Sequence, residues 1–236
     1  MLSIPSGHTS ERRGMERVST GVAGIDAAVG GYPKGRSVLI SGRSGSGKTI
    51  LSLQFAQACA AEGRRVLFIA VRERREDLLE AASAFGWPFD SYEAEKRVHF
   101  MTVSDARGAS PFMDGREVGF TGIVEALGNV DALVIDNLGA LALEMSISHF
   151  RQQIDYLLGS ALAGGVTMVA TCDEGMVHRF GDVAEQAFDT IVRLSRRDIQ
   201  YVDRKERYLE FVKMRFTAAP IDAMTFRIGP KGIELS

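Results

Sequence analysis

The 236-residue sequence contains few cysteines and histidines, and this scarcity removes whole classes of protein. Its two cysteines, Cys59 and Cys172, lie far apart and outside any CxxC pattern, which excludes a disulfide framework and a cysteine zinc site. Both are expected to be buried, reduced thiols, which predicts a cytoplasmic protein. The histidines have no ligand spacing with cysteines or acids, so no metal-binding histidine is expected.

The chain also lacks a long apolar run and an excess of either charge. No apolar stretch approaches the roughly 18 residues of a membrane span, so no membrane association is expected. The polar start of the chain has no apolar core of a secretory signal and is predicted to be a flexible tail over residues 1–17. The formal net charge of −2 gives no global basic field for nucleic acid.

Apolar strands and amphipathic helices alternate over most of the chain, which predicts an α/β fold with a mostly parallel, twisted sheet flanked by helices. Strands are expected at 37–41, 65–71, 98–103, 131–136 and 166–172, and helices at 48–62, 76–85, 120–127 and 150–163. Three further strands, at 190–195, 208–214 and 223–228, have no long helix between them and are expected to add to the sheet in antiparallel fashion. Without repeats or linkers, residues 18–236 are predicted to form a single domain.

A phosphate-binding loop follows the first long apolar strand. Its sequence is Gly42-Arg43-Ser44-Gly45-Ser46-Gly47-Lys48-Thr49, with the spacing G-x-x-x-x-G-K-T. The glycines allow several backbone N–H groups to converge, and the helix that begins with Lys48, Thr49 and Ile50 directs its N-terminal dipole at the same point. The motif predicts ATP, with Lys48 on the β- and γ-phosphates and the Thr49 hydroxyl on Mg²⁺.

Two carboxylates after neighbouring strands are candidates for the rest of the chemistry. Asp136 ends the apolar strand at 131–136, where the second Mg²⁺-holding group belongs. Glu73 is the first carboxylate after the strand at 65–71 and is a candidate for orienting or deprotonating water. The alternative for Glu73 is a solvated, ion-paired helix start.

Two cations near the C-terminus, Lys213 and Arg215, alternate with apolar Val212 and Met214 and are expected on one face of a strand. Like charges on one face repel unless an anion lies between them. A phosphate bound to a neighbouring subunit would be such an anion, which gives both residues a possible catalytic role in trans. A solvated strand face explains the same pattern equally well.

These motifs together resemble the KaiC branch of the RecA-like ATPases. The resemblance covers residues 18–236 and is carried by the phosphate-binding loop and by the segments 18–26, 30–37, 85–87, 135–138, 213–215 and 226–235. It implies a RecA-type core, ATP bound at subunit interfaces, a ring-shaped homohexamer, and a trans contact from Lys213 and Arg215. The clock protein of this family carries two such domains in tandem.

Two departures from the family pattern bear on activity. The family places two adjacent glutamates after the strand ending at Val71, whereas this chain has Arg72-Glu73, so hydrolysis is expected to be slow or absent. The stretch that matches the family's autophosphorylated serine and threonine, residues 183–189, contains no hydroxyl group, so autokinase activity is not expected.

The sequence therefore predicts a slow, Mg²⁺-dependent ATPase that acts as a nucleotide-driven switch on an unidentified protein partner. One alternative is a non-hydrolysing ATP sensor that docks on a larger machine. The other is a RecA-like DNA repair ATPase, but the expected strand-binding loop at 173–182 has three acids against one arginine and one histidine, which opposes DNA binding.

Overall fold

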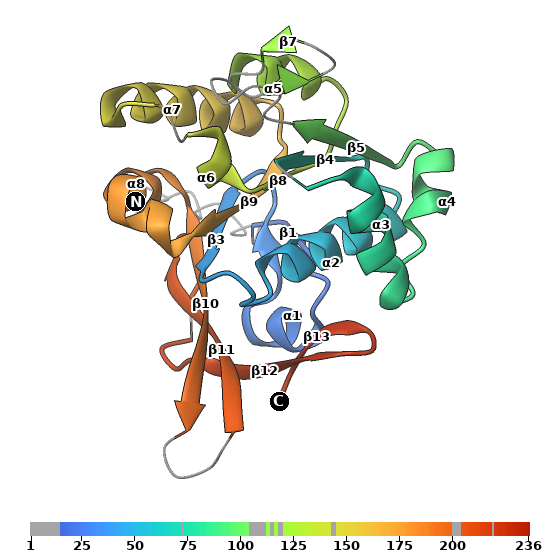
Figure 1. Ribbon diagram of the computed structural model, residues 1–236, viewed down its shortest axis with the longest axis vertical. Coiled ribbons are helices and arrows are strands. Elements are labelled where there is room, and N and C mark those ends of the chain that lie inside the picture. Colours follow the sequence, from blue (N-terminus) through green and yellow to red (C-terminus); the bar gives the residue numbers. More distant parts are fainter. Residues whose placement is uncertain are drawn as a thin grey trace, which may run out of the picture.

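The computed structural model describes residues 15–71, 73–103, 112–113, 116–117, 120–142, 145–199, 204–218 and 220–236. Within them, a nine-stranded sheet lies between two layers of helices (Figure 1). The helices are α1 (Ala23–Val29), α2 (Lys48–Ala61), α3 (Arg75–Ala84), α4 (Phe89–Ala94), α5 (Phe120–Ala126), α6 (Leu138–Leu141), α7 (Ile147–Ala163) and α8 (Glu174–Ala187). The strands of this sheet are β3 (Ser37–Gly42), β4 (Val66–Val71), β5 (Val98–Val103), β8 (Ala132–Asp136), β9 (Thr167–Asp173), β10 (Thr190–Ile199), β11 (Arg204–Met214), β12 (Met224–Gly229) and β13 (Gly232–Leu235).

The strand order is β13-β12-β11-β10-β3-β9-β8-β4-β5. All pairs from β10 to β5 are parallel, and β10 to β13 pair antiparallel. The predicted fold class is therefore confirmed. Two small two-stranded antiparallel sheets lie outside this sheet: β1 (Arg17–Val18) with β2 (Tyr32–Pro33), and β6 (Phe112–Met113) with β7 (Arg116–Glu117). Residues 1–14 of the predicted tail lie outside the described residues.

Each face of the sheet has its own apolar core. Buried side chains of α1 to α4 pack on one face, together with those of the antiparallel strands. Buried side chains of α5 to α8 pack on the other face, where Phe150 of α7 contacts Phe120 of α5 and Phe180 of α8. Because both faces are covered, the central strands β3 and β8 are buried at every position, which explains their continuous apolar sequences. None of the helices in the described ranges combines the length and apolarity needed to cross a bilayer.

The segment after β9 corrects the sequence prediction. Residues 173–182 were expected to form a loop, but α8 begins at Glu174 and runs for 14 residues. Its buried residues Phe180, Val183 and Ala184 recur at helical spacing and anchor it to the core. Two glycines, Gly175 and Gly181, lower the helix propensity of this segment, and tertiary packing overrides it.

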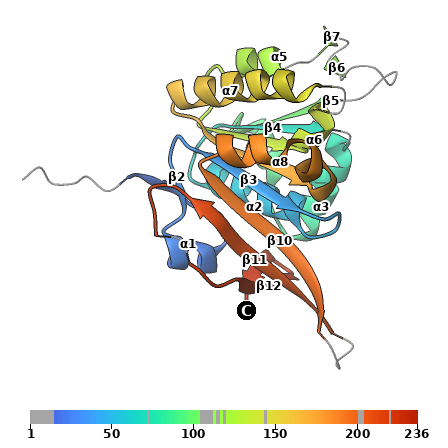
Figure 2. The same ribbon diagram turned by 90° about the vertical axis from the view of Figure 1, so that its left-hand side faces the viewer.

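The strands β10 and β11 form a long hairpin that extends beyond the body of the sheet (Figure 2). Their pairing register shifts between Ile191, which pairs with Lys213, and Val192, which pairs with Phe211. Val212 is therefore the extra residue of a β-bulge, and it is exposed whereas Met214 is buried. The regular alternation expected around Lys213 is interrupted at this point.

Candidate nucleotide-binding site

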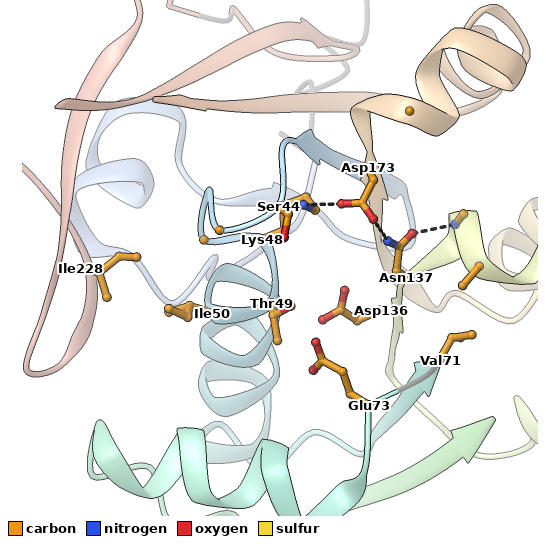
Figure 3. Close-up of a pocket in the computed structure, with 15 residues that line it drawn as sticks. Ser44, Lys48, Thr49, Ile50, Val71, Glu73, Asp136, Asn137, Asp173 and Ile228 are labelled. Carbon is orange, nitrogen blue, oxygen red and sulfur yellow. Dashed lines mark hydrogen bonds and ion pairs between the residues drawn. The ribbon is translucent and has the colours of Figure 1, made fainter. Parts of the chain in front are cut away.

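A cavity of about 590 Å³ opens at the carboxyl ends of β3, β4, β8 and β9 (Figure 3). This is the edge of a parallel α/β sheet where ligands are generally bound. Its lining residues are Ser44, Gly45, Gly47, Lys48, Thr49, Ile50, Val71, Glu73, Asp136, Asn137, Gly139, Ala140, Asp173, Gly175 and Ile228.

The loop between β3 and α2 requires its glycines. Gly45 and Gly47 have φ angles of 75° and 107°, in the left-handed region that favours glycine. Gly47 is also the N-cap of α2, and no side chain caps this helix end, so its first N–H groups are available to a ligand. The helix end lies at the cavity, as an anion-binding site requires.

Two residues of the predicted loop site, Gly42 and Ser46, do not line the cavity. Gly42 ends β3, where a Cβ atom would lie 2.3 Å from the carbonyl oxygen of Leu194 in β10. Ser46 is buried, and its backbone N–H donates to the Arg43 carbonyl at 3.1 Å. Both residues therefore support the conformation of the loop without lining the cavity, whereas the other predicted binding residues of the loop line it.

Lys48 lies at the base of the cavity and is only 8% exposed. Its Nζ atom is 2.7 Å from Oδ1 of Asp173 and donates to the carbonyl oxygens of Gly42 and Arg43, both at 3.0 Å. The partners of the ammonium group are thus one carboxylate and two loop carbonyls. A phosphate oxygen would compete with them for Lys48.

Asp136 and Thr49 approach each other across the cavity (Figure 3). The Asp136 carboxylate is 5% exposed, its Oδ1 atom accepts a hydrogen bond from the Thr171 hydroxyl, and its buried Oδ2 atom has no hydrogen-bond partner among the described residues. Burial raises the pKa of Asp136, whereas the Thr171 and Thr49 hydroxyls and Lys48 lower it. A hard cation between Oδ2 and the Thr49 hydroxyl would satisfy the free oxygen, so the oxygen donor set fits Mg²⁺.

Glu73 lies in the turn between β4 and α3, and its carboxylate points toward Asp136 (Figure 3). Partial burial raises the pKa of Glu73, and the nearby Asp136 and Asp77 carboxylates raise it further, while Lys48 lowers it. The side chain is therefore a stronger base than an ordinary glutamate and still reaches solvent. Arg72, which stands at the expected first glutamate, lies outside the described residues.

Lys213 and Arg215 are not part of this cavity. Lys213 Nζ donates to the carbonyl oxygens of Glu185 and Phe188, both at 2.6 Å, at the C-terminal end of α8. Arg215 follows β11 in a turn and contacts Asp189 Oδ1 at 3.4 Å. Burial and the neighbouring Arg215 lower the pKa of Lys213. Within the chain, this pair lies at the C-terminal end of α8, where cations interact favourably with the helix dipole.

The sequence does not predict seven of the lining residues as site residues: Val71, Asn137, Gly139, Ala140, Asp173, Gly175 and Ile228. The Asn137 amide donates to Asp173 Oδ2 at 2.5 Å, and its Oδ1 atom accepts from the Gly139 N–H at 2.7 Å. Asp173 is the last residue of β9, as Asp136 is the last residue of β8. This shared position is the feature of the sequence that could have marked Asp173 as a site residue. Ile228 comes from β12 and faces Ile50, and nothing local in the sequence marks it (Figure 3).

A parallel sheet, a phosphate-binding loop that leads into a helix, and an acidic residue at the end of a nearby strand define a RecA-like P-loop nucleoside triphosphatase. Comparison with known proteins agrees. The chain belongs to the KaiC ATPase family, whose model, described as "ATPase: KaiC", matches residues 18–236. This membership supports ATP binding and hydrolysis in general terms.

The chain is 28% identical over 252 residues to the circadian clock oscillator protein KaiC of Prochlorococcus marinus, covering 100% of this chain and 48% of that protein. It is 31% identical over 237 residues to the circadian clock protein KaiC3 of Synechocystis sp., covering 95% of this chain and 46% of that protein. The chain thus spans about half the length of these curated relatives. A crystal structure of a KaiC-like protein from Pyrococcus horikoshii OT3 matches with a TM-score of 0.79 and 28% identity, covering 94% of this chain and 99% of that one.

Proposed function

We propose that the protein binds ATP with Mg²⁺ and hydrolyses it slowly at the subunit interfaces of a ring-shaped homo-oligomer, a homohexamer by analogy with the family. The observation that carries this proposal is the unpartnered, buried Oδ2 atom of Asp136, which faces Thr49 beside the uncapped start of α2. A buried charge without a partner costs stability, and such a cost is expected at a site built for a ligand.

In this proposal the phosphate-binding loop holds the triphosphate, and two oxygen-bearing side chains hold the metal beside it. The amide groups from Ser44 to Ile50 would surround the phosphates, with Lys48 on the β- and γ-phosphates. Thr49 and Asp136 would hold Mg²⁺, which when bound neutralises charge on those phosphate oxygens. The apolar side chains of Ile50 and Ile228 border the cavity and suit the flat face of a base.

The first test is ATP binding by Lys48→Ala, measured by titration calorimetry with Mg²⁺. This variant should lose most of its affinity because the ammonium group no longer reaches the phosphates. Lys34→Ala is the matched control, since Lys34 pairs with Glu16 on the surface and should leave affinity unchanged. Undiminished binding by Lys48→Ala would refute the phosphate-loop assignment.

Hydrolysis is proposed to depend on Glu73, which would orient or deprotonate the attacking water. Its raised pKa and its position at the cavity beside Asp136 support this role. Glu73→Gln should bind ATP normally and release phosphate much more slowly than the parent protein. If the two proteins turn over ATP equally fast, the base lies elsewhere.

The roles of Lys213 and Arg215 are proposed in trans. Because both lie at the far end of α8 and outside their own cavity, they can act only on a nucleotide held by a neighbouring subunit. An arginine supplied in trans contributes roughly 10³–10⁵ in rate in related enzymes. Mixing Arg215→Ala with Lys48→Ala should restore part of the activity in mixed rings, and the absence of any rescue would count against the contact.

The proposed biological role is a nucleotide-driven switch on a partner protein, in the cytoplasm. Nucleotide bound at a subunit boundary stabilises the assembly by mass action, and its hydrolysis removes the trans contact.

Burial raises the pKa of both cysteine thiols to about 12, so they are suited to packing and not to redox chemistry.

Measuring phosphate release and particle mass with and without ATP separates the nucleotide-driven switch from a non-hydrolysing sensor. Adding single-stranded DNA to the same measurements tests the less favoured DNA-dependent role.

A further inference from the structure

The ammonium group of Lys48 already contacts three oxygen atoms in the structure. Its Nζ atom donates hydrogen bonds to the carbonyl oxygens of Gly42 and Arg43, both at 3.0 Å, and forms an ion pair with Asp173 Oδ1 at 2.7 Å. A phosphate oxygen that approaches Lys48 therefore competes with these three oxygen atoms.

Of these three partners, Asp173 is the one that a phosphate would displace most readily. The two carbonyls are neutral and belong to the phosphate-binding loop itself, whereas Asp173 is a carboxylate at the end of β9. A carboxylate 2.7 Å from Nζ lies where the phosphate should bind, and it would repel the negatively charged triphosphate. Its side chain is 50% exposed and makes no capping hydrogen bond to α8, so it can move without breaking a helix cap.

The carboxylate is also held by a second side chain. Asn137 donates to its second oxygen at 2.5 Å, and Asn137 is itself fixed by the N–H of Gly139. The dashed contacts in Figure 3 form one chain from Lys48 through Asp173 and Asn137 to the start of α6. Asp173 is thus directed at Lys48 by the end of the neighbouring strand β8, and this is not a chance contact between two flexible side chains.

We propose that Asp173 is a resident anion that occupies Lys48 until nucleotide binds, so that phosphate must displace it and the affinity for ATP is lowered by its presence. Asp173 is in this sense a positioning residue that acts through Lys48. The inference rests on the proposed function, because it assumes that Lys48 receives the phosphates.

The neighbouring residue supplies a matched control. Glu174 pairs with the exposed Arg43 of the same loop, with Oε2 2.8 Å from Nε, and does not contact Lys48. Glu174→Gln therefore removes the same charge from the same region but leaves the Lys48 contact intact. Comparing it with Asp173→Asn separates the specific contact from the general electrostatic effect of one negative charge near the nucleotide.

The experiment measures the dissociation constants of Mg²⁺-ATP and of inorganic triphosphate for the parent protein, Asp173→Asn and Glu174→Gln at fixed ionic strength. Asp173→Asn should bind both ligands about tenfold more tightly than the parent, since a charge-assisted contact no longer has to be broken. The increase in affinity should be the same for both ligands, because Asp173 competes with the phosphates and not with the adenine base. Asp173→Ala, which has no polar side-chain atom to pair with Lys48, should change in the same direction. Melting curves check that each variant is folded.

The possible failures are distinguishable. If the parent binds ATP and the affinity of Asp173→Asn for ATP rises no more than that of Glu174→Gln, this inference is wrong and the proposed function stands. A gain for ATP without a gain for inorganic triphosphate would also refute it. If none of the proteins binds either ligand, the proposed function and the inference fall together.

Discussion

Replacing Asp136 with asparagine should make the nucleotide-free protein more stable. Asp136 is 5% exposed, and its Oδ2 atom has no hydrogen-bond partner among the described residues. Burial raises the pKa of this carboxyl above its ordinary value of 3.8. The folded state therefore holds a proton more tightly than the unfolded state, and stability is lost as the pH rises through the folded pKa. At neutral pH the charged carboxylate destabilises the fold.

The size of the effect follows from what the substitution leaves in place. The asparagine oxygen can still accept the hydrogen bond from Thr171, and its amide group replaces an unpartnered charged oxygen with an unpartnered neutral donor. The difference between these two burial costs is about 1–2 kcal/mol in the free energy of unfolding. For a chain of this size it corresponds to a rise in melting temperature of about 2–8 °C.

The assay is thermal unfolding with a metal chelator and without nucleotide, over a range of pH. The gain of Asp136→Asn over the parent should be largest near neutral pH and should shrink toward acid pH, where the parent carboxyl is protonated. Asp222→Asn, at an exposed position, is the control and should leave the melting temperature unchanged. Mg²⁺-ATP should stabilise the parent but not Asp136→Asn. An unchanged or lower melting temperature for Asp136→Asn would show that the carboxylate is already compensated and would remove the main argument for a metal site.

Two further predictions concern Glu73 and Gln54. The pKa of Glu73 is raised above its ordinary value of 4.5, so the rate of single-turnover hydrolysis should begin to fall at a higher pH than an ordinary glutamate would give. A rate that stays constant down to pH 4.5 would exclude Glu73 as the base. Gln54 of α2 donates to the Gly21 and Ile233 carbonyls at 2.7 and 3.2 Å and accepts from the Ile233 N–H at 2.8 Å. Gln54→Leu should therefore lower the free energy of unfolding by about 2–4 kcal/mol in denaturant titrations, because it strands buried polar groups. The exposed Gln152→Leu should change it little, and equal stability of the two variants would contradict this account.

Local features of the fold were predictable because neighbouring residues carry them. The strand, glycine-rich turn and helix from Ser37 to Ala61 are contiguous, so apolar runs and glycine spacing suffice to specify them. The antiparallel end of the sheet followed from strands without helices between them. The helix α8 was missed although Phe180, Val183 and Ala184 have helical spacing, because its glycines oppose the helix that packing enforces.

The amino-acid sequence alone determined the phosphate-binding loop, the parallel core and three candidate residues. The loop motif marks Thr49, and positions at or just after the ends of strands mark Asp136 and Glu73. Only the tertiary structure decided which of these groups meet. The strand order places β9 and β8 side by side, so Asp173 reaches Lys48 and Asn137 from a distant part of the chain. The same packing sends Lys213 and Arg215 to the far end of α8, away from their own cavity. Contacts between residues so far apart in sequence depend on sheet order and burial, which no local pattern encodes.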